Sequence, residues 1–164
     1  MKRKPWLIAL ALTYPLSLQP AMAEDDKNKV VHIDVMGCVT AELQVLPYSS
    51  QYSAGTVSAS ATMRSNIPNS SFDANAYQCL GSWAALGGEF QQQAICQGLT
   101  PSGEKWLVQI RDNGQKGKWE MVDATGPLKG ASGGGEYIRI IQFPQLKPTQ
   151  TQFCHRITGS ITRP

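Results

Sequence analysis

The segment Lys116–Tyr137 restricts the fold more than any other part of this chain. A short strand, Lys118–Asp123, runs into a turn at Thr125-Gly126-Pro127. A second glycine cluster, Gly133-Gly134-Gly135, follows before the sequence becomes β-branched again. Short strands separated by glycine-marked turns are typical of antiparallel sheet. The segment therefore predicts a sheet that turns tightly and closes on itself.

Alternation of apolar and polar residues extends this prediction along the chain. In Glu104–Arg111, for example, Trp106, Val108 and Ile110 fall on one side of the strand. A period of two with one apolar face marks half-buried antiparallel strands. Four segments show it clearly and four more weakly: Cys38–Leu46, Thr56–Met63, Glu104–Arg111 and Gln152–Thr162, then Ala74–Trp83, Glu89–Gln97, Lys118–Asp123 and Gly135–Phe143. No segment after residue 23 shows a sustained helical period, so we predict an all-β fold of eight strands.

The first residues have the three parts of a secretory signal peptide. Lys2, Arg3 and Lys4 precede an apolar run, and Ala21-Met22-Ala23 supplies the small residues of a cleavage site. A retained membrane anchor needs about 20 apolar residues, and this run is shorter and interrupted by prolines. We predict a signal peptide over residues 1–23, a single barrel domain over residues 24–164, no stable membrane anchor, and export to the periplasm or the medium.

Removal of the leader also removes the basic character of the chain. The full sequence has 15 Lys and Arg against 12 Asp and Glu, and three of the basic residues lie in the leader. The remaining chain is formally neutral and has no basic cluster. A nucleic-acid partner is therefore not expected, because such partners require a positively charged surface.

All four cysteines remain after cleavage: Cys38, Cys79, Cys96 and Cys154. An even number of cysteines in an exported protein indicates two disulfides. Zinc is the competing interpretation, but the spacings contain no CxxC knuckle, so no metal site is predicted. With its cysteines paired, the chain also has no thiol nucleophile.

The strand pattern selects one of the three cysteine pairings. A two-residue turn at Gly87-Gly88 places Cys79 opposite Cys96, close enough for a disulfide. Cys38 then pairs with Cys154 by elimination. These two cysteines lie on the polar faces of the first and last strands, which are neighbours only if the sheet closes into a barrel.

The run from Cys79 to Tyr137 resembles the bacterial allene oxide cyclase barrel-like proteins, small exported domains of largely unassigned function. The resemblance rests on Cys79, Gly87-Gly88, Cys96, Gly117-Lys118-Trp119, and the turn from Gly126 to Gly130 that leads to Gly133-Gly134-Gly135. It implies an eight-stranded antiparallel barrel of the allene oxide cyclase and dirigent type. The chain departs from the pattern at Pro127 and lacks an acidic Asp-x-Asp-Gly-Asp loop. No active-site constellation is carried over, so no catalytic residue and no cofactor are predicted.

The candidate ligand-binding residues are His155, Arg139, Tyr137 and Trp119. His155 lies between Phe153 and Ile157 on an apolar face. It acts either as a general base or ligand contact inside the barrel, where it would titrate near neutral pH, or as a hydrogen-bonded core residue or a residue near the barrel rim. Arg139 either enters the interior and binds a carboxylate or stays on the surface. Trp119 is also expected in the buried core.

Three function classes follow from these observations. The first is a non-enzymatic exported barrel that binds a small apolar or amphipathic molecule in its interior. The second, by analogy of fold alone, is an isomerase or cyclase of a lipid-like substrate. The third is a protein-binding module such as a periplasmic lysozyme inhibitor, whose Ser-Gly-x-x-Tyr loop is similar to Ser132–Tyr137 with one extra residue.

Overall fold

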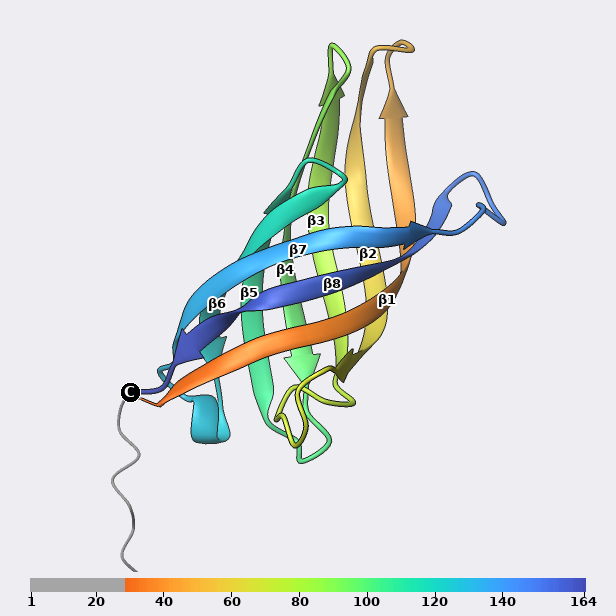
Figure 1. The fold of residues 1–164 in the computed structure, drawn as a ribbon. Coiled ribbons are helices and arrows are strands. Elements are labelled where there is room, and N and C mark those ends of the chain that lie inside the picture. Colours follow the sequence, from red (N-terminus) through yellow and green to blue (C-terminus); the bar gives the residue numbers. More distant parts are fainter. Residues whose placement is uncertain (1–28) are drawn as a thin grey trace, which may run out of the picture.

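The computed structural model describes residues 29–164, so the predicted leader lies outside the described residues. Eight strands follow one another: β1 Val30–Pro47, β2 Tyr52–Ser65, β3 Ala76–Leu86, β4 Glu89–Leu99, β5 Lys105–Asp112, β6 Lys116–Ala124, β7 Ser132–Gln142 and β8 Gln150–Thr162. A single 3-10 turn, η1 Gly126–Leu128, lies between β6 and β7. Each strand pairs antiparallel with the next, and β8 pairs with β1 to close the barrel (Figure 1).

The eight-stranded antiparallel barrel predicted from the sequence is therefore confirmed. The largest difference concerns β1, which begins at Val30 rather than at Cys38. Its early part pairs with the end of β8, and Ile33 and Val35 extend the inward apolar face. The cluster Gly133-Gly134-Gly135 also differs from the prediction, because it lies inside β7 rather than in a turn. Among the described residues, no helix is long and apolar enough to cross a membrane.

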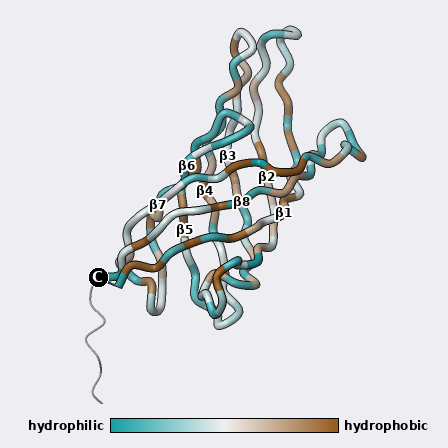
Figure 2. Tube along the Cα trace, in the orientation of Figure 1, coloured by the Kyte–Doolittle hydropathy of each residue, from teal (hydrophilic) through white to brown (hydrophobic). Residues whose placement is uncertain are grey.

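The alternating pattern places the predicted apolar faces inside the barrel. Hydrophobic and hydrophilic residues follow one another along the strands in Figure 2. Trp106 and Trp119, both predicted to be buried, are 5% and 6% exposed. Burying a large apolar side chain stabilises the fold by about 1.5–3 kcal/mol. The interior is therefore the hydrophobic core of the molecule.

Glycines make room for the rings that point inward. Cross-strand pairs that place a glycine opposite a ring include Gly37 with His155, Gly55 with Trp83, Gly98 with Trp106, and Gly117 with Tyr137. A methyl group on Gly98 would lie 1.9 Å from the Trp106 ring, and one on Gly37 would lie 2.7 Å from His155 Nε2. Because no side chain fits there, the ring packs directly on the neighbouring backbone.

The β3–β4 hairpin has the predicted two-residue turn. Gly87 and Gly88 both have positive φ, 64° and 91°, as a type I′ turn requires. This turn places Cys79 opposite Cys96, and the two form a disulfide on the inner face. The second predicted disulfide, Cys38–Cys154, joins β1 to β8 on the outer face. Chain-entropy arguments give roughly 3 kcal/mol for the first and 4–5 kcal/mol for the second.

The two ends of the barrel differ. Hairpins β1–β2 and β3–β4 project from one end, as the top of Figure 1 shows. At the other end, Phe72 from the β2–β3 loop and Leu128 from η1 are buried, 4% and 3% exposed. The side-chain amide of the fully buried Asn75 lies 3.2 Å from Trp106 Nε1 there and can accept its hydrogen when the amide oxygen faces the indole. One end of the interior is thus closed by packed side chains.

Candidate functional site

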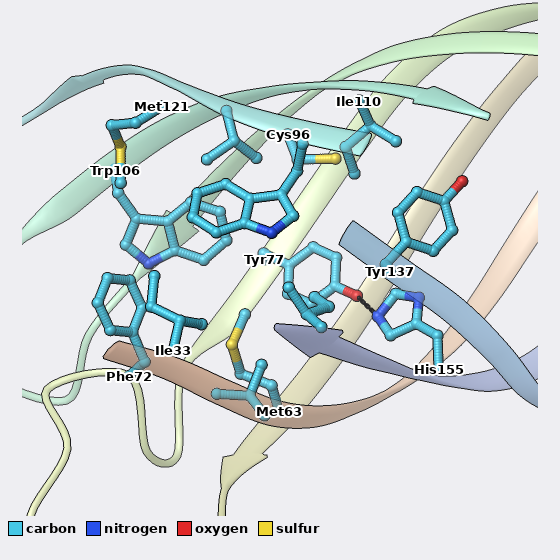
Figure 3. Close-up of a pocket in the computed structure, with 14 residues that line it drawn as sticks. Ile33, Met63, Phe72, Tyr77, Cys96, Trp106, Ile110, Met121, Tyr137 and His155 are labelled. Carbon is cyan, nitrogen blue, oxygen red and sulfur yellow. Dashed lines mark hydrogen bonds between the residues drawn. The ribbon is translucent and has the colours of Figure 1, made fainter. Parts of the chain in front are cut away.

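The interior holds two adjoining spaces. A void of about 50 Å³ lies near the closed end, among Ile33, Phe72 and Trp106 (Figure 3). A larger cavity of about 220 Å³ lies on the side of the projecting hairpins. Five residues border both spaces and separate them: Tyr77, Cys96, Ile110, Tyr137 and His155. The void near the closed end is a packing void. The larger cavity can hold a molecule of one or two rings, since a cavity of about 150 Å³ already holds benzene.

A buried hydrogen bond forms the centre of this partition. The Tyr77 hydroxyl lies 2.8 Å from His155 Nε2, linking β3 to β8 across the barrel (Figure 3). Burial, and then the positive charge of Arg139, lower the pKa of His155 to about 4. Burial also raises the pKa of Tyr77 above its usual value. Both groups are therefore neutral at neutral pH. Of the roles considered for His155 from the sequence, the hydrogen-bonded core position is observed, and the lowered pKa argues against the titration near neutral pH that the ligand-contact role implied.

Arg139 lies on the inner face of β7, opposite His155 in the register with β8. It is half-buried and lines the larger cavity. Its Cζ atom lies 4.1 Å from the centre of the Phe153 ring, a cation–π contact. Nη1 donates a hydrogen bond to Gln142 Oε1 (3.2 Å), whereas Nε is buried and has no acceptor in the described structure. Of the two positions considered from the sequence, the interior one is observed.

Aromatic rings border the outer part of the cavity. Trp83 and Phe90, from β3 and β4, stack with their centroids 5.9 Å apart and their planes at 15°. Trp83 packs over Gly55, and its Nε1 atom is buried without an acceptor in residues 29–164. Gln145 from the β7–β8 loop also lines this part of the cavity. The cavity therefore has aromatic and aliphatic walls with a few polar groups, as small-molecule sites generally do.

Tyr137, on β7, is a further polar group in the interior. Burial, and then the neighbouring Asp112 carboxylate, raise the pKa of its phenol. Tyr137 thus also stays neutral, which leaves Arg139 as the charged side chain lining the cavity. No cluster of three or more His, Cys, Asp or Glu side chains suited to a metal ion occurs in the part of the chain that the structure describes. Asp34 and the exposed His32, two residues apart on β1, do not form such a cluster, and Asp34 forms an ion pair of 2.7 Å with Arg156.

The structure brings three of the four candidate residues together. His155, Arg139 and Tyr137 all line the larger cavity. Trp119 instead lines the void near the closed end, and its Nε1 donates a hydrogen bond to the Thr158 carbonyl oxygen (3.0 Å). The partition therefore separates Trp119 from the larger cavity.

Comparison with solved structures identifies the fold. The pterocarpan synthase dirigent protein GePTS1 superposes with a TM-score of 0.55 over 92% of this chain and 98% of its own, at 11% identity. The pterocarpan synthase dirigent protein PsPTS1 gives 0.51 over 82% and 96%, at 9% identity. This chain has the dirigent-like barrel fold. No protein-family model matches the sequence, and no curated protein matches it.

The cavity residues of this dirigent-like barrel that were not among the candidates include Tyr77, Trp83 and Phe90. The alternation in β3 carries the signal for two of them. Counting by twos from Cys79 puts Tyr77 and Trp83 on the inner face of the strand. The hydrogen bond from Tyr77 to β8 had no signal in the sequence, because it depends on which strands face each other across the barrel.

Proposed function

We propose that this protein is a non-catalytic exported barrel that binds a small apolar or amphipathic molecule in the cavity of about 220 Å³. This cavity is the observation that carries the proposal. Ligand sites are concave, mostly apolar, and oriented by a few polar groups. Here Val57, Ala59 and Phe153 form apolar wall, and Arg139 and His155 supply the polar groups. The structural neighbours are named pterocarpan synthases, which supports a ring-containing ligand.

Export and family membership belong to the same proposal. Disulfides persist in oxidising compartments, and this chain holds two, with no free cysteine among residues 29–164. The predicted signal peptide and the dirigent-like barrel agree with a bacterial allene oxide cyclase barrel-like protein. Its mature form would begin at Glu24.

An isomerase or cyclase is the second candidate, because Tyr77 and His155 form an internal titratable pair. General acid–base catalysis works best when the pKa lies near the working pH. The pKa of His155 is lowered to about 4 and that of Tyr77 is raised, so at neutral pH the first is a weak base and the second a weak acid. The pair is better suited to fixing the cavity floor than to transferring protons.

The lysozyme-inhibitor candidate loses support from the backbone. Ser132–Tyr137, the segment compared with the inhibitor loop, lies in β7 and pairs with β8 along its length. A segment held in a barrel wall does not present its side chains as a protruding loop does.

Native mass spectrometry of the protein purified from its own source tests this proposal. We expect the protein to begin at Glu24 and to carry a small molecule that is released on unfolding. Ala59→Phe, on the inner face of β2, should abolish that added mass because the ring fills the cavity. Ser58→Phe, on the exposed face of the same strand, is the matched control and should retain it. A ligand retained by Ala59→Phe would contradict binding in this cavity.

A further inference from the structure

Arg139 lacks a partner for its charge inside the barrel. The ion pairs found within residues 29–164, Arg64–Asp73 and Arg156–Asp34, both lie on the outer surface. Arg139 is half-buried, and its contacts, a hydrogen bond to the neutral Gln142 and a cation–π contact with Phe153, supply no negative charge. Burying a charge or an N–H donor without a partner costs free energy. A group that enters the cavity with negative charge would remove that cost.

Asp112 does not fill this role. Its carboxylate acts on Tyr137, and it forms no ion pair with Arg139 in the described structure. It does not line the larger cavity. The counter-ion of Arg139 must therefore come from a molecule in the cavity or from solvent.

A second unpaired donor faces the same space. Trp83, on β3, lies four strands from β7 and hence across the closed barrel from Arg139. Its indole N–H is buried and has no acceptor in the part of the chain described. Both side chains line the larger cavity. The complementary ligand thus carries acceptor oxygens and an apolar body that fits between rings.

From this geometry we infer that the ligand is a small aromatic carboxylate, bound by its carboxylate to Arg139 and by its ring between the cavity walls. The inference rests on the proposed function and names the ligand class for the same cavity. A guanidinium presents a planar fork of donors that matches a carboxylate, and Nε is already free to bind. The stacked Trp83–Phe90 pair and Phe153 provide aromatic surface. A volume of about 220 Å³ suits one or two rings rather than a long chain.

Three probes of equal size separate charge from shape: 2-naphthoate, 2-naphthamide and 2-naphthylmethylammonium. By titration calorimetry at neutral pH, we expect the protein to bind 2-naphthoate about tenfold more tightly than the amide, and the ammonium most weakly. Arg139→Gln should weaken 2-naphthoate binding about tenfold and leave the amide within about twofold. Arg111→Gln, which removes an exposed arginine of β5, is the matched control and should change neither.

The outcomes distinguish this inference from the proposed function. Equal affinity for all three probes would overturn the carboxylate inference and leave a cavity that binds neutral rings. No binding of any probe would contradict both. If Arg139→Gln does not fold, the order of the three probes on the unmodified protein, and the loss of the preference for naphthoate at high salt, still decide the question.

Discussion

His155 occupies a position where protonation is unfavourable. It is 5% exposed, bonded to Tyr77, and close to the charged Arg139. Its pKa is about 4 in the folded protein, against about 6.5 in an unfolded chain. Between these values the unfolded chain binds a proton that the folded protein does not. Stability is therefore complete above about pH 6.5 and falls as the pH drops toward 4.

We predict that the lowered pKa of His155 reduces the free energy of unfolding by about 2–3 kcal/mol when the pH falls from 7.5 to 4.5. His155→Gln keeps a polar side chain but has no titrating group, so its stability should fall much less over the same range. Urea unfolding of both proteins at the two pH values measures the difference. Arg156 and Asn66 lower the pKa of the Asp34 carboxyl to about 2. Its contribution to stability is therefore lost only at pH values below these two. Equal pH dependence in the two proteins would show that His155 is readily protonated in the fold.

The limits of sequence prediction are clearest for single residues. The alternation along β8 correctly placed His155 inward, because a period of two fixes the face of a side chain. It could not give the pKa, which depends first on burial by the surrounding strands and then on the charge of Arg139 from β7. Arg139 and Ile141 lie on either side of a register shift against β8, which explains why the mixed pattern of β7 left its face undecided.

At the level of the strands, the glycines serve mainly as contact surfaces. Glycines in a β-rich sequence mark either turns or close backbone approaches, and Gly87-Gly88 forms a turn. Gly133-Gly134-Gly135 instead allows β6, β7 and β8 to approach closely: a methyl group on Gly135 would lie 1.9 Å from the Thr158 carbonyl oxygen. Turn and contact glycines look alike in sequence, so only the paired strands distinguish them. Nothing in the sequence indicated the bulge in β6, because a bulge is recognised only from the register with the neighbouring strand. This bulge turns Asp123 outward and Ala124 inward.

The pair Gly98–Trp106 tests this role of the glycines. Trp106→Ala should cost about 3–5 kcal/mol because it opens a cavity in the core. Gly98→Ala should cost about 1–3 kcal/mol, since its methyl group would overlap the ring. In the Trp106→Ala background the same change should be close to neutral or stabilising, because the space is free and alanine restricts the unfolded chain. Urea unfolding of the four proteins gives the coupling energy, and additive effects would rule out the contact.

At the level of the whole molecule, closure was predictable and the cavity was not. Cys38 and Cys154 implied that the first and last strands meet, and they do. Whether an eight-stranded barrel is filled or hollow depends on the sizes of side chains from all strands at each level. Here Phe72 and Leu128 fill one end, whereas Ala41, Ala59 and Ala94 leave space beneath the projecting hairpins. No single strand carries that information.

The Cys38–Cys154 bond has a further consequence for a molecule that is stretched. Tension applied to the chain ends passes through this bond, so the segment between the two cysteines, which are 116 positions apart in the sequence, is shielded from the load. Only the short ends of β1 and β8 outside it can extend, by roughly 6 nm at about 3.5 Å per residue. Single-molecule pulling of Cys38→Ser/Cys154→Ser should release roughly 40 nm instead. Equal extension of the two proteins would show that the bond does not carry the load. With the bond intact, a force that pulls on the two chain ends cannot unfold the strands between Cys38 and Cys154.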